Sequence, residues 1–401
     1  MAVTPNVARR NAIVLAASQA IVGSAPSICI SMGGLAGAYL LAADKSLATA
    51  PVTGFNVGVA IGALPAAALM RAVGRRNGFR SGVLLTACGG ALAALALFHH
   101  SFWLFCAGLL LVGGGNSFVQ QYRFAAADNA PDAFKASAIA WVMTGGIFAA
   151  IIGPQTVIWT RQFFAPVMFA GCFAAIIALA AAGFLVLSFL RLPNDLPGAK
   201  SDGGDARPLP VILSQPRFIV GFLCGVGSYG LMSFVMTGAP LAMVGCGLST
   251  DQAALGISWH VLAMYGPSFF TGKLIARFGK ERIIAAGLAL LFCCALVSLS
   301  GLHLWQFWSA LVLLGCGWNF SFIGATTMIT ETYRPSEKNK VQGTHDLMLF
   351  ATVAFSSLMS GRVYDAYGWD VLNWIVFPVV LACFVALGSL SLRPSAGGSA
   401  S

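Results

Sequence analysis

The alternation of long apolar runs with short basic loops constrains the fold of this chain more than any other feature. Gly272–Arg282, with the sequence GKLIARFGKER, closes one apolar run and opens the next. Arg71–Arg80, RAVGRRNGFR, repeats the arrangement earlier in the chain. Two apolar helices joined by a short basic loop leave that loop on the cytoplasmic side of a membrane. Glycines in such loops are expected to let helix ends approach closely. The two copies therefore predict a doubled membrane bundle.

The composition agrees with a membrane protein. Of the 401 residues, 58% are hydrophobic and 9% are charged, and the mean hydropathy is +0.82. An average soluble domain has about a quarter charged residues. The net charge of +10 does not indicate nucleic-acid binding, because the cations lie between apolar runs and form no basic face.

The cysteines predict neither a metal centre nor a disulfide framework. The ten cysteines are scattered through apolar segments, without a CxxC motif or a Cys/His cluster. No motif for a cofactor is present either, so none is expected. Arg9 and Arg10 precede an apolar run that is too long for a signal peptide, which predicts a retained first spanning helix.

Twelve apolar runs reach the length of about 20 residues that a membrane span needs. They cover residues 12–41, 47–70, 81–99, 102–126, 136–159, 163–190, 216–244, 252–276, 282–300, 303–330, 341–362 and 368–392. The polar stretch 191–215, rich in Pro, Gly and Asp, is predicted to be a cytoplasmic linker. It would separate a six-helix half at 1–190 from a second half at 216–393, and 394–401 would be a disordered tail.

The distribution of cations supports this topology. With the amino terminus inside, only Lys45, Arg161 and Arg362 among the 23 lysines and arginines fall on the outer side. We therefore expect a multi-pass protein of a bacterial inner membrane, with both termini cytoplasmic. We expect it to contact the lipid bilayer as a monomer.

An internal repeat relates the two halves. Val22-Gly23-Ser24 recurs as Val226-Gly227-Ser228, and Asn116 maps onto Asn319 at nearly the same offset. Since each half has six helices, the halves run in the same direction. Parallel halves of this kind describe a large class of secondary transporters, in which the solute binds between the halves near the middle of the membrane.

The basic loops resemble a known motif. Gly272-Lys273-Leu274 and Arg277-Phe278-Gly279-Lys280 resemble the loop motif of the major facilitator superfamily, and Gly74-Arg75-Arg76 is its weaker twin. The resemblance implies an all-α membrane protein of twelve helices in two related halves. The acid of the motif is absent from both copies, where Arg71 and Ala276 stand. These loops either gate the transporter or only set its topology.

Polar residues in the predicted spans indicate where a solute binds. Asn116, Gln120 and Arg123 are spaced i, i+4 and i+7, which places them on one helical face. The repeat carries this stripe to Asn319, Ile323 and Thr326. The stripes either hold a solute or make hydrogen bonds between helices, and Arg123 could instead pair with Asp128. Superfamily members are similar in lining their cavity with helices 1, 4, 7 and 10.

Other candidate ligands lie in the neighbouring spans. His260 maps onto Asn56 and could bind solute, carry a proton or bond to a neighbouring helix. Aromatic side chains could stack on a flat ligand, or could serve only for packing. The aromatic candidates are Trp141, Tyr229, Trp259 and Trp318.

Asp346 is the one carboxylate clearly inside a predicted span. Burial would raise its proton affinity and allow proton coupling. The alternative is a structural salt bridge to Arg334 or to another loop cation.

A narrower resemblance suggests the solute. Ser46–Phe79 and Gln120-Gln121-Tyr122-Arg123-Phe124 are similar to a bacterial branch that includes riboflavin importers. Riboflavin is a neutral polyol chain on a flat tricyclic ring, which suits a lining of amides, hydroxyls and aromatic rings. Motifs typical of proton-driven drug exporters are absent, since Leu109 stands where their arginine would be.

Three classes of function remain from the sequence. The first is an importer of riboflavin or of a similar neutral ring compound. The second is a proton-coupled efflux antiporter for drugs or metabolites. The third, a membrane enzyme or sensor, is disfavoured because paired carboxylates, a nucleophile motif and a phosphate loop are all missing from the sequence.

Overall fold

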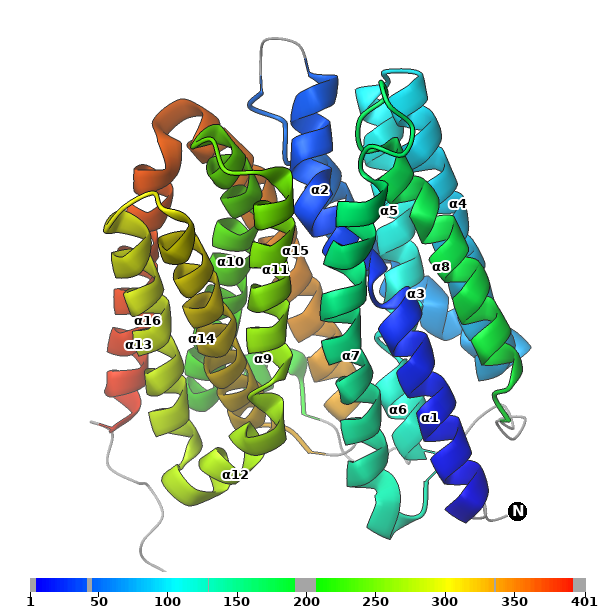
Figure 1. The fold of residues 1–401 in the computed structure, drawn as a ribbon. Helices are drawn as coiled ribbons and strands as arrows, with labels where there is room; N and C mark the ends of the chain where they lie inside the picture. Colours follow the sequence, from blue (N-terminus) through cyan, green and yellow to red (C-terminus); the bar gives the residue numbers. More distant parts are fainter. Residues whose placement is uncertain (1–4, 42–44, 129, 192–206, 335–336, 392–401) are drawn as a thin grey trace, which may run out of the picture.

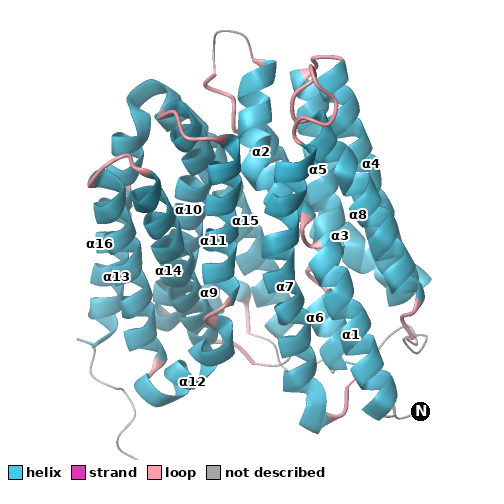
Figure 2. Cartoon of the chain, viewed as in Figure 1, coloured by secondary structure: helices cyan, strands magenta, loops and turns pink. Residues whose placement is uncertain are grey.

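The computed structural model describes residues 5–41, 45–128, 130–191, 207–334 and 337–391. All regular secondary structure in these ranges is helical, which confirms the predicted all-α fold (Figure 1, Figure 2). The helices are α1 Pro5–Val22, α2 Ala25–Leu40, α3 Ala50–Val73, α4 Arg75–Phe98, α5 Phe102–Val119, α6 Tyr122–Asp128, α7 Asp132–Thr160, α8 Ala170–Ser188, α9 Leu209–Leu213, α10 Pro216–Gly245, α11 Thr250–Tyr265, α12 Ser268–Phe278, α13 Lys280–Leu299, α14 Leu304–Thr330, α15 Lys338–Trp374 and α16 Val376–Ser391.

Ten helical stretches in the described residues are long and apolar enough to cross a membrane. One of them, Lys340–Leu390, contains two predicted spans, and its backbone leaves the helical conformation at Gly368, where φ is 78°. The predicted span 252–276 forms α11 and α12, which have 16 and 11 residues and are each too short to cross alone. The count of twelve crossings stays a prediction.

Prolines explain two interruptions that the sequence prediction missed. The predicted span 12–41 breaks after Val22, and α2 restarts with Pro26 in its first turn. Proline has no N–H to donate to the preceding turn, which weakens the helix there, although Pro65, Pro154 and Pro240 lie inside continuous helices. The equivalent helix α10 carries Gly230 at the position of Pro26 and runs unbroken. Pro267 separates α11 from α12 in the same way.

The helices form two groups that lie side by side. Figure 1 shows α1–α8 on one side of the molecule and α10–α16 on the other. We call the end that carries the amino terminus and the α3–α4 and α12–α13 turns the basic end, and the other the opposite end. Residues 192–206 of the predicted linker and the predicted tail 394–401 lie outside the described residues.

The loop glycines serve backbone conformation and not close packing, which corrects the prediction. Gly74 and Gly279 have φ angles of 80° and 85°, in the region where a side chain is strained. A Cβ added to Gly74 or Gly272 would meet no atom within 4 Å. Close approach occurs instead at Gly113, where a Cβ would lie 1.9 Å from the Phe55 carbonyl oxygen.

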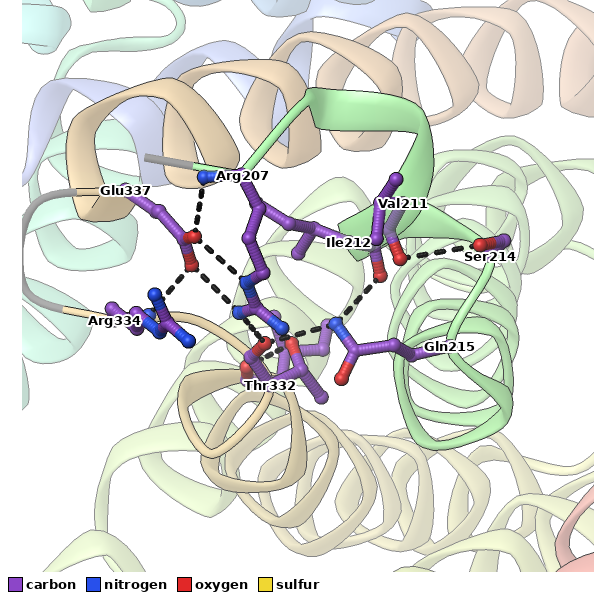
Figure 3. A network of polar contacts seen from close by, with 9 residues as sticks. Arg207, Val211, Ile212, Ser214, Gln215, Thr332, Arg334 and Glu337 are labelled. Atoms are coloured by element: carbon purple, nitrogen blue, oxygen red, sulfur yellow. Dashed lines mark hydrogen bonds and ion pairs between the residues drawn. The ribbon is translucent and has the colours of Figure 1, made fainter. Parts of the chain in front are cut away.

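The described end of the linker is clamped to the start of α15 (Figure 3). The Arg207 guanidinium donates to both carboxylate oxygens of Glu337, at 2.8 and 2.7 Å, and also to the Thr332 carbonyl. The backbone N–H groups of Arg207 and Arg334 donate to the same carboxylate. The Glu337 side chain is only 1% exposed. This convergence ties α9 and the α14–α15 turn together at the basic end.

Replacing Glu337 with glutamine should lower the thermal stability of the protein in detergent by a few degrees. The hydrogen bonds from Arg207 hold the pKa of the Glu337 carboxyl well below its usual range. A depressed pKa in the folded protein stabilises it at pH values above the ordinary glutamate pKa of about 4.3. The stabilisation is lost as the pH falls below that value. The difference in Tm between wild type and Glu337→Gln should therefore be full at pH 7 and shrink in acid. A constant difference at all pH values would contradict this account.

Candidate functional site

Polar contacts between the two groups gather toward the opposite end. Thr49 Oγ1 accepts the Gly361 N–H at 3.2 Å, and the Thr53 and Ser357 hydroxyls lie 2.9 Å apart. Arg161, at the end of α7, forms an ion pair of 2.7 Å with Asp251 at the start of α11. These contacts fasten α3 to α15 and α7 to α11, so the two groups are joined at that end.

An aromatic cluster lies in the α10–α16 group, where it faces α1–α8. It consists of Tyr229 on α10, Trp318 and Phe322 on α14, and Phe350 on α15. The Trp318 and Phe322 rings stack at 5.2 Å with an angle of 13° between their planes. Tyr229 meets these rings edge-on at 5.3 and 5.1 Å, and its centroid is 6.3 Å from that of Phe350. Phe350 also packs against the apolar core that residues of α2–α8 share with Leu241 and Ala254 of the other group, which places the cluster at the junction between the two groups.

Opposite charges flank the cluster. Arg123 of α6 and Asp346 of α15 both lie close enough for their charges to act on the Tyr229 hydroxyl. The charge of Arg123 also reaches Tyr265, at the end of α11. The Tyr265 ring packs against Gly146 of α7, since a Cβ there would lie 3.6 Å from ring atoms. The junction thus brings together a cation from one group and an acid and two tyrosines from the other.

Asn116 and Asn319 differ sharply, although the repeat predicts equivalent roles. Asn319 is fully buried, and its amide donates to the Met264 carbonyl at 2.6 Å and to Ser268 Oγ at 2.7 Å. Its carbonyl oxygen accepts the Thr271 hydroxyl at 2.6 Å. Met264 and Ser268 flank the Pro267 break, so Asn319 satisfies polar groups that the interrupted helix leaves free. Helix packing, the alternative to solute contact, is therefore favoured for Asn319.

Asn116 does not bind polar groups of an interrupted helix. Its side chain is 8% exposed, and the described residues offer its amide no hydrogen-bond partner. Asn116 lies on α5, which packs against α3. Helix α3 continues through Pro65 without interruption, so the α1–α8 group has no break equivalent to that at Pro267. The Asn116 amide is not among the fully buried polar groups without a partner, so it stays accessible to water or to a ligand. Asn116 therefore remains a candidate ligand.

The remaining residues of the first stripe are exposed. Gln120 is the exposed C-cap residue of α5. A turn at residues 120–121 separates α5 from α6, so Arg123 does not lie on the same regular helical face as Asn116. The Arg123 guanidinium lies 4.8 Å from the ring centroid of Phe124. Asn56 is half-buried and lies one helical turn from Thr53, on the face of α3 that contacts α15. Binding roles for these three stay predictions.

Two predicted ligands on α11 lie away from the cluster. His260 is fully buried, and its Nδ1 is 2.8 Å from the Leu311 carbonyl oxygen of α14, which favours a bond between helices. The neighbouring Ser258 hydroxyl donates to the Ala150 carbonyl of α7. Trp259, about 100° further round the helix, is 47% exposed beside Trp308. Trp308 lines a surface hollow of about 750 Å³ at the opposite end, so Trp259 faces outward.

Two polar atoms on α14 are buried without a partner in the described residues. They are Trp318 Nε1 and Thr326 Oγ1. Trp318, Phe322 and Thr326 follow each other at i, i+4 and i+8, so they form the stripe of α14 that faces the junction. The sequence prediction had placed Asn319 and Ile323 on this stripe, one residue out of register.

The predicted gating loops are partly paired. Arg76 donates to the Ser188 carbonyl at 2.6 Å. Lys280 pairs with Glu331 at 2.6 Å, and Arg217 joins the same carboxylate at 3.2 Å. Arg75 is half-buried, and Arg277 is exposed over the Phe278 ring. Glu331 thus serves Lys280 as an ion-pair partner in place of the missing motif acid.

Asp346 is not buried, which corrects the premise of the sequence prediction. Its side chain is 60% exposed, and it accepts a hydrogen bond from His345 Nδ1 at 3.0 Å. His345 itself is buried, and its Nε2 has no partner in the part of the chain that the structure describes. Asp346 lies one turn from Phe350 on the junction face of α15.

Phe322, Phe350 and Tyr265 were not among the predicted ligands. The i, i+4 spacing of Trp318 and Phe322 was the available signal, because aromatic residues at that spacing share a helical face. Phe350 and Tyr265 become recognisable only when α15 and α11 are placed beside the other group. No cluster of metal-ligating side chains occurs among the described residues.

Comparison with protein families identifies the family to which the sequence is similar. It matches the profile of the Major Facilitator Superfamily over residues 11–343 and again over 222–400. The riboflavin transporter RfnT of Brucella anthropi is 51% identical over 96% of this chain and 97% of its own length. The uncharacterized MFS-type transporter YddS of Bacillus subtilis is 30% identical, covering 92% of this chain and 90% of the relative.

Solved structures share the fold at low sequence identity. The POT family transporter PepTSo superposes with a TM-score of 0.73 at 13% identity, covering 98% of this chain and 99% of that one. The Escherichia coli fucose:proton symporter FucP gives a TM-score of 0.62 at 16% identity, with 98% and 100% covered. These similarities support the architecture alone.

Proposed function

The chain belongs to the major facilitator superfamily, and from that membership we propose that it imports riboflavin across a bacterial inner membrane. The identity of 51% to a riboflavin transporter over nearly the full length of both chains carries this proposal. The site supports it. Stacked aromatic rings suit a flat tricyclic ring, and free amides suit a hydroxyl-rich chain.

Transport would proceed by alternating access between two six-helix halves, 1–190 and 216–393. The contacts of Thr49, Thr53 and Arg161 would close the protein on one side while the solute exchanges on the other. Since cations collect at the basic end, we assign that end and both termini to the cytoplasm. The described conformation would then be closed to the outside, with twelve crossings in a monomer.

Uptake of labelled riboflavin by an auxotroph that lacks its own importer tests the proposal. Cells expressing this chain should accumulate riboflavin and grow at low external concentrations, whereas cells with the empty vector should not. Failure to rescue growth, despite insertion of the protein in the membrane, would rule out riboflavin import. Drug resistance on overexpression in those same cells would favour the efflux alternative.

Asp346→Asn combined with a proton uncoupler tests whether import is coupled to protons. If the exposed Asp346 carboxylate carries a transported proton, the uncoupler should reduce wild-type uptake by about tenfold, and the variant should be equally low without it. If uptake is facilitated, wild type should be insensitive to the uncoupler. Initial uptake rates distinguish the two mechanisms, with Asp365→Asn, at another exposed carboxylate of α15, as the control variant.

A further inference from the structure

We propose that the two halves divide recognition of the solute, so that α10, α14 and α15 bind the flat ring while α3 and α5 bind the polar chain. This inference rests on the proposed function and deepens it. It predicts which part of the ligand each variant affects.

The ring side is defined by the aromatic cluster. Trp318 and Phe322 are stacked with nearly parallel planes, at 13°, so a further flat ring can extend the stack. Tyr229 stands edge-on to both. Tyr229, Phe322 and Phe350 are only half-buried, so their faces are not used up by packing. Every member of the cluster comes from the second half.

The chain side is defined by amides. Asn116 and Asn56 have no hydrogen-bond partner among the described residues, although Asn116 is largely buried. An amide provides two donors and an acceptor with two lone pairs, which matches the hydroxyls of a polyol. The α7 surface facing the second half presents Gly146 and Ala150, which offer no ring for stacking.

The reverse arrangement is disfavoured by Asn319. As the repeat mate of Asn116, it is the equivalent amide on the second half. Its amide is already committed to Met264, Ser268 and Thr271. The Pro267 break therefore removes the amide from one half and leaves the free amide to the other.

A competition assay with two ligands tests the division. The affinity of purified full-length protein is measured for riboflavin and for a ring-only flavin analogue that lacks the polyol chain. Asn116→Leu should weaken riboflavin binding by about tenfold through lost hydrogen bonds, and should change the affinity for the analogue by less than about twofold. Phe322→Leu keeps an apolar side chain but removes the ring, so it should weaken both ligands by a similar factor.

Controls make the outcomes distinct. Phe355→Leu, on α15 at a side chain that is 63% exposed, should leave both affinities unchanged. Asn116→Ala replaces Asn116→Leu if the leucine variant does not fold. Equal weakening of both ligands by the Asn116 variants would overturn the division but not riboflavin binding. Absence of riboflavin binding by wild type would overturn the proposed function together with the division.

Discussion

Replacing Gly361 with valine is expected to reduce riboflavin uptake at least tenfold by forcing the opposite end apart. A Cβ at Gly361 would lie 2.3 Å from Thr49 Oγ1 and 2.9 Å from its Cγ2. Real Cβ atoms do not approach other atoms so closely, so the Thr49 side chain must move away, and the larger valine side chain is expected to push α3 and α15 apart there. Separation would also break the contact between Thr53 and Ser357. A cysteine at position 53 should react with a membrane-impermeant thiol reagent faster in the variant than in the Gly361 parent.

Gly388→Val is the matched control, because a Cβ at Gly388 meets no atom within 4 Å. It should leave uptake and cysteine reactivity near wild-type values. Shortening the opposing side chain, in the double variant Gly361→Ala with Thr49→Ala, should recover part of the lost uptake. If Gly361→Val transports normally, the opposite end does not close through this contact.

Asn319→Leu is expected to destabilise the protein, by roughly 2–4 kcal/mol, and thereby to lower its Tm in detergent. The leucine removes three hydrogen bonds and leaves the Met264 carbonyl and the Ser268 hydroxyl unsatisfied beside the Pro267 break. A free carbonyl in an apolar interior costs free energy because no water replaces the lost donor. The Tm of each variant is measured by monitoring how buried cysteines become reactive as the protein is heated.

Asn116→Leu provides the comparison within the repeat. Its amide has no partner in the described structure, so the substitution removes no hydrogen bond within the protein. It should therefore change Tm by less than about 1 °C. It should reduce uptake instead. Equal loss of stability in the two variants would show that Asn116 is also bound by the protein, contrary to the described structure.

The Gly361 and Asn116 variants are expected to affect different steps of the proposed transport cycle. Gly361→Val would act on closure of the opposite end, whereas Asn116→Leu would act on binding of the solute. Arg161 and Asp251 reinforce the same closure, because each comes from a different half.

Hydropathy and charge were sufficient to predict the helices. A run of apolar residues must form a helix in lipid, because each backbone N–H and C=O needs a partner within the segment. The cations between runs predicted which loops share an end, and the repeat predicted that Asn116 and Asn319 occupy related positions. Pro26 and Pro267 interrupt predicted spans, whereas Pro65 and Pro240 lie inside continuous helices, so proline alone does not predict a break.

Only the tertiary structure decided what the repeated residues do. Asn319 binds the broken helix and Asn116 does not, because only one copy of the repeat carries a proline at the facing position. Trp259 points outward, His260 binds α14, and Phe322 and Phe350 complete the aromatic cluster. Spacing along one helix determines which residues share a face. The direction of that face depends on how the helix is rotated against its neighbours, and that rotation follows from packing between segments far apart in the sequence.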